Sequence, residues 1–100
     1  MTKRYVHLSF NSGATWALGY RPMVEKFFSE NADDWFRVNS ETYILWTNAE
    51  LNWLALGIQR LPGLQHFTVF ASEFVATHFN ATGLMPEEFW TWLYKWRQLG

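Results

Sequence analysis

The sequence predicts an α+β domain built from four short strands and three helices. Segments in which apolar residues alternate stand on either side of segments with helical spacing, and the chain closes with a helix that begins at a proline. With 100 residues the chain has room for one domain, which we place over 1–100. Apolar residues make up 49% of the sequence, which excludes a disordered chain.

The first half of the chain predicts a strand and then a helix. Residues 5–10 form the strand, because every second residue is apolar. A turn-like segment follows it, with asparagine, serine and glycine at 11–13. The helix is expected from near Pro22 to Asn31, since proline suits the first helical turn and apolar residues then recur on one side.

The middle of the chain predicts a hairpin and a second helix. Two β-prone runs over 35–38 and 42–46 are expected to pair across the polar residues between them. Thr47 and Glu50 have the spacing of a capping box, in which the threonine accepts from the third helical N–H and the glutamate reaches back. We therefore expect a helix from Thr47 to the stop at 61–63.

Residues 64–80 fit two secondary structures. They fit a strand over 65–71, and they also fit a helix with Phe67, Phe70, Phe74 and His78 on one side. We favour the strand, because β-prone phenylalanine, threonine and valine stand together there. The last element is a helix that opens at Pro86 with two glutamates in its first turn.

This order of elements is the ferredoxin-like β-α-β-β-α-β sandwich with an added, aromatic-rich C-terminal helix. Residues 5–10, 40–47 and 83–93 also carry a family resemblance, the last of them reading Gly-Leu-Met-Pro-Glu-Glu-Phe-Trp-Thr-Trp-Leu. In these segments the chain resembles the small ferredoxin-fold proteins of the SinR-like family and, more distantly, the CRISPR-associated integration-complex dimer.

The resemblance implies a homodimer and, for the CRISPR-associated relatives, a metal-assisted nuclease that uses an aspartate at the end of the first strand. The present sequence departs from that pattern, because its first strand ends at Asn11. A neutral amide is a poor ligand for a hard cation such as magnesium. We therefore do not expect nuclease activity.

Composition excludes further classes of function. The chain has no cysteine, which excludes disulfides, thiolate zinc sites and cysteine nucleophiles. Its formal net charge of -1 argues against a basic surface for nucleic acid. The sequence shows no signal peptide and no membrane-spanning run, so we expect a cytoplasmic protein without a membrane partner.

Polar side chains give no pattern of a catalytic, metal or cofactor site. His7 and His66 are expected on one sheet face, where they could form a metal pair or an acid–base pair. No third metal ligand is evident, and two imidazoles on a sheet face are more often plain polar surface. Asp33 and Asp34 are adjacent, as in a turn, and would point apart in an extended segment. No phosphate loop or nucleophile elbow is present. We predict a non-enzymatic protein without a cofactor.

The aromatic residues predict two contact surfaces. If the helices cover one sheet face, the other would carry an aromatic platform such as single-strand binders use. The candidates for that face are Tyr5, His7, Trp35, Arg37 and His66, together with Phe70. The chain has few basic residues for such a role, so the alternative function that we keep is a nucleic-acid-binding protein or a degenerate nuclease resembling the CRISPR-associated dimer.

The closing helix is apolar on two sides. Phe89, Trp92, Leu93 and Trp96 form one stripe, which we expect to face the domain's own core. Trp90 and Tyr94 fall on another side, and Arg97 follows one turn later. Tryptophan, tyrosine and arginine are typical of interface hot spots. Trp53 and Leu56 also lie off the core stripe of their helix, and we assign Trp53 to the same surface.

We therefore predict a protein–protein interaction module that forms a homodimer or docks onto another protein through its aromatic surface. Its small size, its lack of chemistry and the SinR-like resemblance suggest an accessory or inhibitory, anti-defence type of protein from a phage or mobile element.

Overall fold

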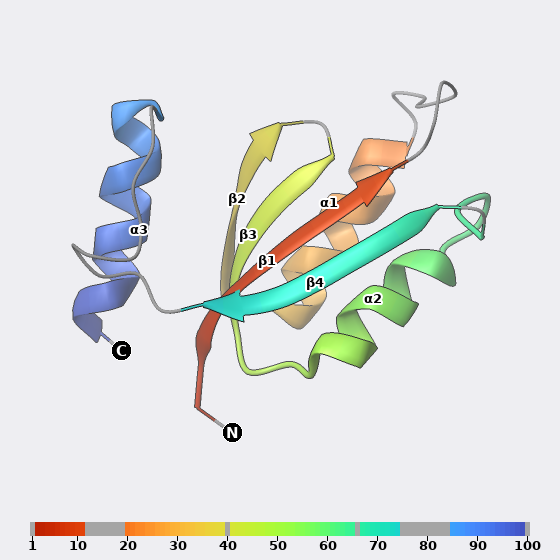
Figure 1. Cartoon of the computed structure of the whole chain (residues 1–100), viewed down its shortest axis with the longest axis horizontal. Coiled ribbons are helices and arrows are strands. Elements are labelled where there is room, and N and C mark those ends of the chain that lie inside the picture. The colour runs from red at the N-terminus through yellow and green to blue at the C-terminus, as the bar shows by residue number, and fades with distance from the viewer. Residues whose placement is uncertain (1, 12–19, 40, 66, 75–84, 100) are drawn as a thin grey trace.

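The computed structural model describes residues 2–11, 20–39, 41–65, 67–74 and 85–99. In that part of the chain it has four strands and three helices, which confirms the α+β class (Figure 1). The elements are β1 (Arg4–Asn11), α1 (Tyr20–Asn31), β2 (Asp34–Asn39), β3 (Thr42–Thr47), α2 (Leu51–Gln59), β4 (Thr68–Phe74) and α3 (Glu87–Leu99).

The four strands form one antiparallel sheet in the order β2-β3-β1-β4. β1 lies between β3 and β4, so that Tyr5 stands opposite Trp46 on one side and opposite Phe74 on the other. Because β3 is antiparallel to both β1 and β2, β1 and β2 run parallel with β3 between them. By the same argument β3 and β4 run parallel with β1 between them. The edges of the sheet are β2 and β4.

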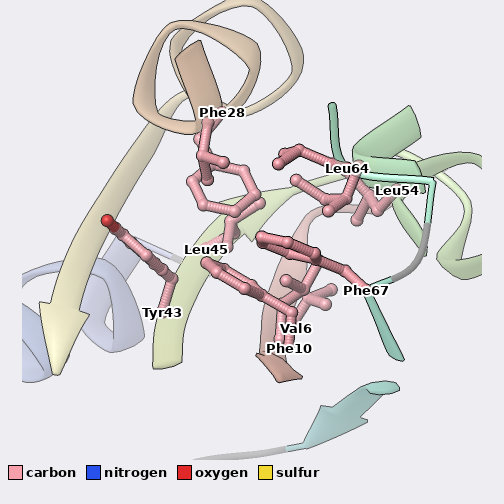
Figure 2. Packing of buried hydrophobic residues seen from close by; sticks show 11 residues of the cluster. Val6, Phe10, Phe28, Tyr43, Leu45, Leu54, Leu64 and Phe67 are labelled. Atoms are coloured by element: carbon pink, nitrogen blue, oxygen red, sulfur yellow. The ribbon is translucent and has the colours of Figure 1, made fainter. Parts of the chain in front are cut away.

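Helices α1 and α2 cover one face of the sheet, which we call the inner face. Side chains of a strand alternate between its two faces, so Val6, Leu8 and Phe10 all point to this side. The buried cluster there is the inner core, and its members come from β1, β3, α1, α2 and the turn before β4. Figure 2 shows the Phe10 and Phe67 rings side by side within it, with their centroids 5.9 Å apart.

Helix α3 covers the opposite, outer face. Tyr5, Ile44 and Trp46 point to this side and form a second buried cluster with Phe89 and Leu93 of α3, which we call the outer core. In Figure 1 α3 lies beside β2, apart from α1 and α2. The sheet is therefore sandwiched between helices on both faces, with a core on each.

The predicted elements are present with shifted bounds. The hairpin of β2 and β3 is confirmed, and its turn is held by the Glu41 backbone N–H, which donates to the Asn39 side-chain oxygen at 2.9 Å. In residues 64–80 the strand interpretation is confirmed, but β4 runs from Thr68 to Phe74. Leu64 and Phe67 are buried in the inner core instead, and the Phe67 N–H donates to the Leu64 carbonyl in a turn. Residues 75–80 lie outside the described part.

The predicted capping box is wrong. α2 begins at Leu51, and Glu50 is its N-cap without a side-chain hydrogen bond. Thr47 is the last residue of β3, where its buried hydroxyl donates to the Asn31 carbonyl at 2.6 Å and accepts from the Ala49 N–H at 3.0 Å. The hydroxyl therefore joins the end of α1 to the start of the loop, and it is not available to cap α2.

Candidate interaction surfaces

The first stripe of α3 packs on the outer face, as the sequence predicted. Phe89 and Leu93 are buried, and Trp92 and Trp96 are partly buried against the same cluster. The Trp96 ring stacks on Trp46, with the centroids 5.8 Å apart. The Tyr5 hydroxyl donates to the Leu93 backbone carbonyl. This side of α3 therefore packs against the outer core, with Phe89 and Leu93 as its buried residues.

Asp34 fixes α3 to the sheet. The indole N–H groups of Trp92 and Trp96 both donate to Oδ2 of Asp34, each at 2.9 Å. The other carboxylate oxygen accepts from the Trp35 backbone N–H at 2.9 Å. Since a carboxylate can accept several hydrogen bonds at once, one side chain satisfies three donors. Asp34 thus has a structural role.

The second side of α3 is half-buried. Trp90 packs partly against the outer core and meets Phe89 edge to face, with the ring centroids 5.0 Å apart. Tyr94 lies one turn on, and its ring centroid is 6.0 Å from that of Trp90. Arg97 is in α3, but its side chain lies outside the described part of the structure. Trp90 and Tyr94 thus form an aromatic pair at the border of the outer core.

The exposed apolar surface of α2 is separate from that pair. Trp53 is 54% exposed and Leu56 is 46% exposed, one turn apart on the same helix. α2 packs on the inner face and α3 on the outer face, so the expectation that Trp53 shares a surface with Trp90 and Tyr94 is wrong. Side-chain periodicity could place Trp53 off the core stripe, but it could not show which sheet face α2 covers.

Trp53 is held in a defined orientation despite its exposure. Its indole N–H donates to the side-chain oxygen of Asn31 at 2.9 Å, and the amide nitrogen of Asn31 donates to the Phe27 carbonyl at 2.8 Å. The indole is thereby tied to the last turn of α1. We call Trp53 and Leu56 the α2 patch.

The predicted aromatic platform is not assembled on one face. Tyr5 is buried beneath α3. Trp35 and Arg37 point to the inner face, because the register pairs Trp35 with Leu45 and Arg37 with Tyr43. The prediction that they share a face with Tyr5 and His7 is therefore wrong. Alternation within β2 is too weak to assign its faces, since most of its residues are half-buried.

His7 and Phe70 do lie on the outer face. His7 is half-buried, and its Nε2 lies 3.2 Å from the hydroxyl of Ser9. Phe70 stands opposite Ser9 and is 64% exposed. His66 is outside the described residues, so the expectation that it shares a sheet face with His7 stays a prediction. Within the described residues no three histidine, aspartate or glutamate side chains gather as they would around a metal ion.

Polar side chains meet at the inner-face edge of β2. Tyr43 donates its hydroxyl hydrogen to Glu25 at 2.8 Å, and the guanidinium of Arg37 lies 3.4 Å from the same carboxylate oxygen. In Figure 2 the Tyr43 hydroxyl points away from the buried cluster. Burial, followed by the hydrogen bond to Glu25, raises the pKa of Tyr43 well above its ordinary value. Tyr43 therefore keeps its proton, as a structural hydrogen-bond donor does.

Compared with known proteins, the chain matches no protein-family model, no curated protein and no solved structure. None of the helices in the described ranges has the length and apolar character needed to cross a membrane.

Proposed function

We propose that the protein is a non-enzymatic interaction module that binds another protein chain through the α2 patch. The observation that carries the proposal is the exposure of Trp53 and Leu56, which lie one turn apart on α2. Each face of the sheet already has a buried core that does not include these two side chains. Contact sites typically contain large apolar side chains that lie together on the surface and are not part of the domain's core.

The hydrogen bond of Trp53 strengthens this proposal. An indole that is fixed by Asn31 before binding loses little conformational entropy when a partner covers it. Tryptophan is also the residue most enriched among interface hot spots. A near-neutral net charge of -1 suits a contact dominated by apolar area.

The strand order and the connections support a finer proposal about the fold. We propose that β1 to β4 with α1 and α2 are a ferredoxin-like unit, to which α3 is added on the outer face. That arrangement has two β-α-β units whose strands interleave. Here β3 lies between β1 and β2 of the first unit, and β1 lies between β3 and β4 of the second. We also propose that the protein is related to the SinR-like family, that it has an accessory or inhibitory role in a phage or mobile element, and that it is cytoplasmic.

Nucleic-acid binding, the alternative predicted from sequence, gains no observation in its favour. Its platform would need Tyr5, Trp35 and Arg37 on one accessible face, and the structure separates them. The alternative is tested by titrating random oligonucleotides at low salt, where a nucleic-acid binder shows affinity that falls steeply as salt is added.

Light scattering tests the proposed function. The molar mass of the wild-type protein is measured across concentration, alone and after mixing with clarified lysate of a bacterial host. We expect a dimer mass or a partner-bound mass, and we expect Trp53→Ala to lose it while staying folded. Phe70→Ala is the matched control, because it removes an exposed aromatic side chain from another element. Equal assembly of wild type and Trp53→Ala would contradict the proposal.

A further inference from the structure

An open groove with an aromatic floor runs between α3 and the edge strand β2. Its lining comes from β2 and from one side of α3, namely Phe36, Glu87, Glu88, Thr91, Trp92 and Lys95. The Phe36 and Trp92 rings form the floor, with their centroids 5.8 Å apart and their planes tilted by 43°. All of these residues belong to the described part of the chain.

The net charge around the groove is negative, since three carboxylates lie at it against one lysine. Glu87 and Glu88 are exposed in the first turn of α3, at one end of the groove. At the other end the Lys95 ammonium lies 3.8 Å from Asp34 and 4.7 Å above the Trp96 ring. The positive charge of Lys95 therefore already faces a carboxylate and an indole. Glu87 and Glu88 are therefore the dominant charges at the opening of the groove.

The floor is suited to a cation for an electronic reason. A positive group is attracted to the face of an aromatic ring, and tryptophan gives the strongest attraction. The Trp92 N–H donates to the Asp34 carboxylate at 2.9 Å, and such donation increases the electron density of the indole. Flanking carboxylates add a second attraction for the same charge. Aromatic faces and carboxylates together favour an organic cation over an apolar side chain.

The groove also lies at an accessible position in the fold. β2 is an edge of the sheet, so an extended segment can approach the groove along that edge without passing another strand. We infer that the groove binds an arginine or lysine side chain from a basic, extended segment of a partner protein. This inference rests on the proposed function, because it specifies the chemistry of one partner contact, but it uses none of the residues of the α2 patch.

The experiment is a titration of the full chain with two synthetic peptides, acetyl-Gly-Arg-Arg-Gly-amide and its citrulline counterpart. Citrulline keeps the shape of arginine and removes its charge. Binding is followed at low salt through the indole N–H signals in ¹H–¹⁵N spectra, in which Trp92→Phe assigns the Trp92 signal. We expect the arginine peptide to move the Trp92 signal and to bind about tenfold more tightly than the citrulline peptide.

The double variant Glu87→Gln, Glu88→Gln should weaken arginine-peptide binding about fivefold to tenfold. The matched control is Glu30→Gln, Glu50→Gln, which changes net charge equally at exposed sites outside the groove. Equal weakening by both double variants would mean that overall charge attracts the peptide, and would overturn the inference. An unmoved Trp92 signal would overturn it as well. If assembly still depends on Trp53 in either case, the proposed function stands without the groove.

Discussion

Replacing Asp34 by asparagine should loosen α3 from the sheet. In the wild-type protein Oδ2 of Asp34 accepts two indole N–H groups and Oδ1 accepts the Trp35 N–H. Asparagine has one side-chain oxygen, so it cannot serve both sets of donors. If the oxygen stays with Trp35, the amide NH₂ faces the two indole donors.

The magnitude follows from the bonds that change. A hydrogen bond to a charged group contributes about 1.5–3 kcal/mol and a neutral one about 0.5–1.5 kcal/mol. If the oxygen faces the two indoles instead, losing charge assistance at both bonds costs about 2 kcal/mol, and the Trp35 N–H left without its acceptor adds about 1 kcal/mol. The Asp34 side chain is 32% exposed, so water compensates part of the loss. We expect a decrease of about 2 kcal/mol in the free energy of unfolding, which lowers Tm by about 8–16 °C in a domain of this size.

Urea unfolding followed by circular dichroism measures this change, and amide hydrogen exchange locates it. Exchange should accelerate in α3 more than in α1 and α2, because the lost contacts join α3 to β2. Asp33→Asn is the matched control, since Asp33 forms an exposed ion pair with Lys3 that contributes about 0–1 kcal/mol. If both variants lose the same stability, or if exchange in α3 is unchanged, the anchoring role of Asp34 is refuted.

Two further predictions concern the inner layer. Gly57→Ala should destabilise the protein by about 1–2 kcal/mol in urea unfolding, although alanine is the better helix former, because the added Cβ would overlap the Phe27 ring. The additional change Phe27→Ala should remove that penalty in a double-mutant cycle, and a Gly57→Ala variant more stable than wild type would contradict the close packing. Tyr43 should make the free energy of unfolding fall at high pH, because its pKa is raised in the folded state. The stability that Tyr43 contributes is complete below the ordinary pKa of 10.0 and is lost as the pH rises beyond that value. Unfolding free energies between pH 9 and 11.5 should therefore fall more steeply for wild type than for Tyr43→Phe, and parallel curves would disprove the role of Tyr43.

The local parts of the fold could be predicted from the sequence. Alternation in residues 5–10 identified β1 because one face of that strand is buried in the inner core, and the closing helix was signalled by Pro86 and its apolar stripe. The hairpin was signalled by two β-prone runs with polar residues between them. The bounds of β4 differed from the prediction, because the predicted start at residue 65 falls in a turn that buries Phe67.

The parts that depend on long-range packing could not be predicted. Most of β2 is half-buried on both faces, so nothing in its pattern indicated that Trp35 and Arg37 point to the inner face. The contact of Asp34 with Trp92 joins residues that are 58 positions apart, and no local signal pairs them. The separation of Trp53 from Trp90 likewise depends on which sheet face each helix covers.

In the proposed function, Trp53 is the side chain that a partner chain covers. The most direct measurement is ¹⁹F NMR of protein labelled with 5-fluorotryptophan, in which Trp53→Phe assigns the Trp53 signal. Spectra are recorded across protein concentration and after mixing with clarified lysate of a bacterial host. On assembly the Trp53 signal should shift and lose its dependence on H₂O against D₂O, while the signal of Trp46, which is buried in the outer core, should stay unchanged. An increase in molar mass with an unchanged, solvent-sensitive Trp53 signal would contradict the proposed role of Trp53.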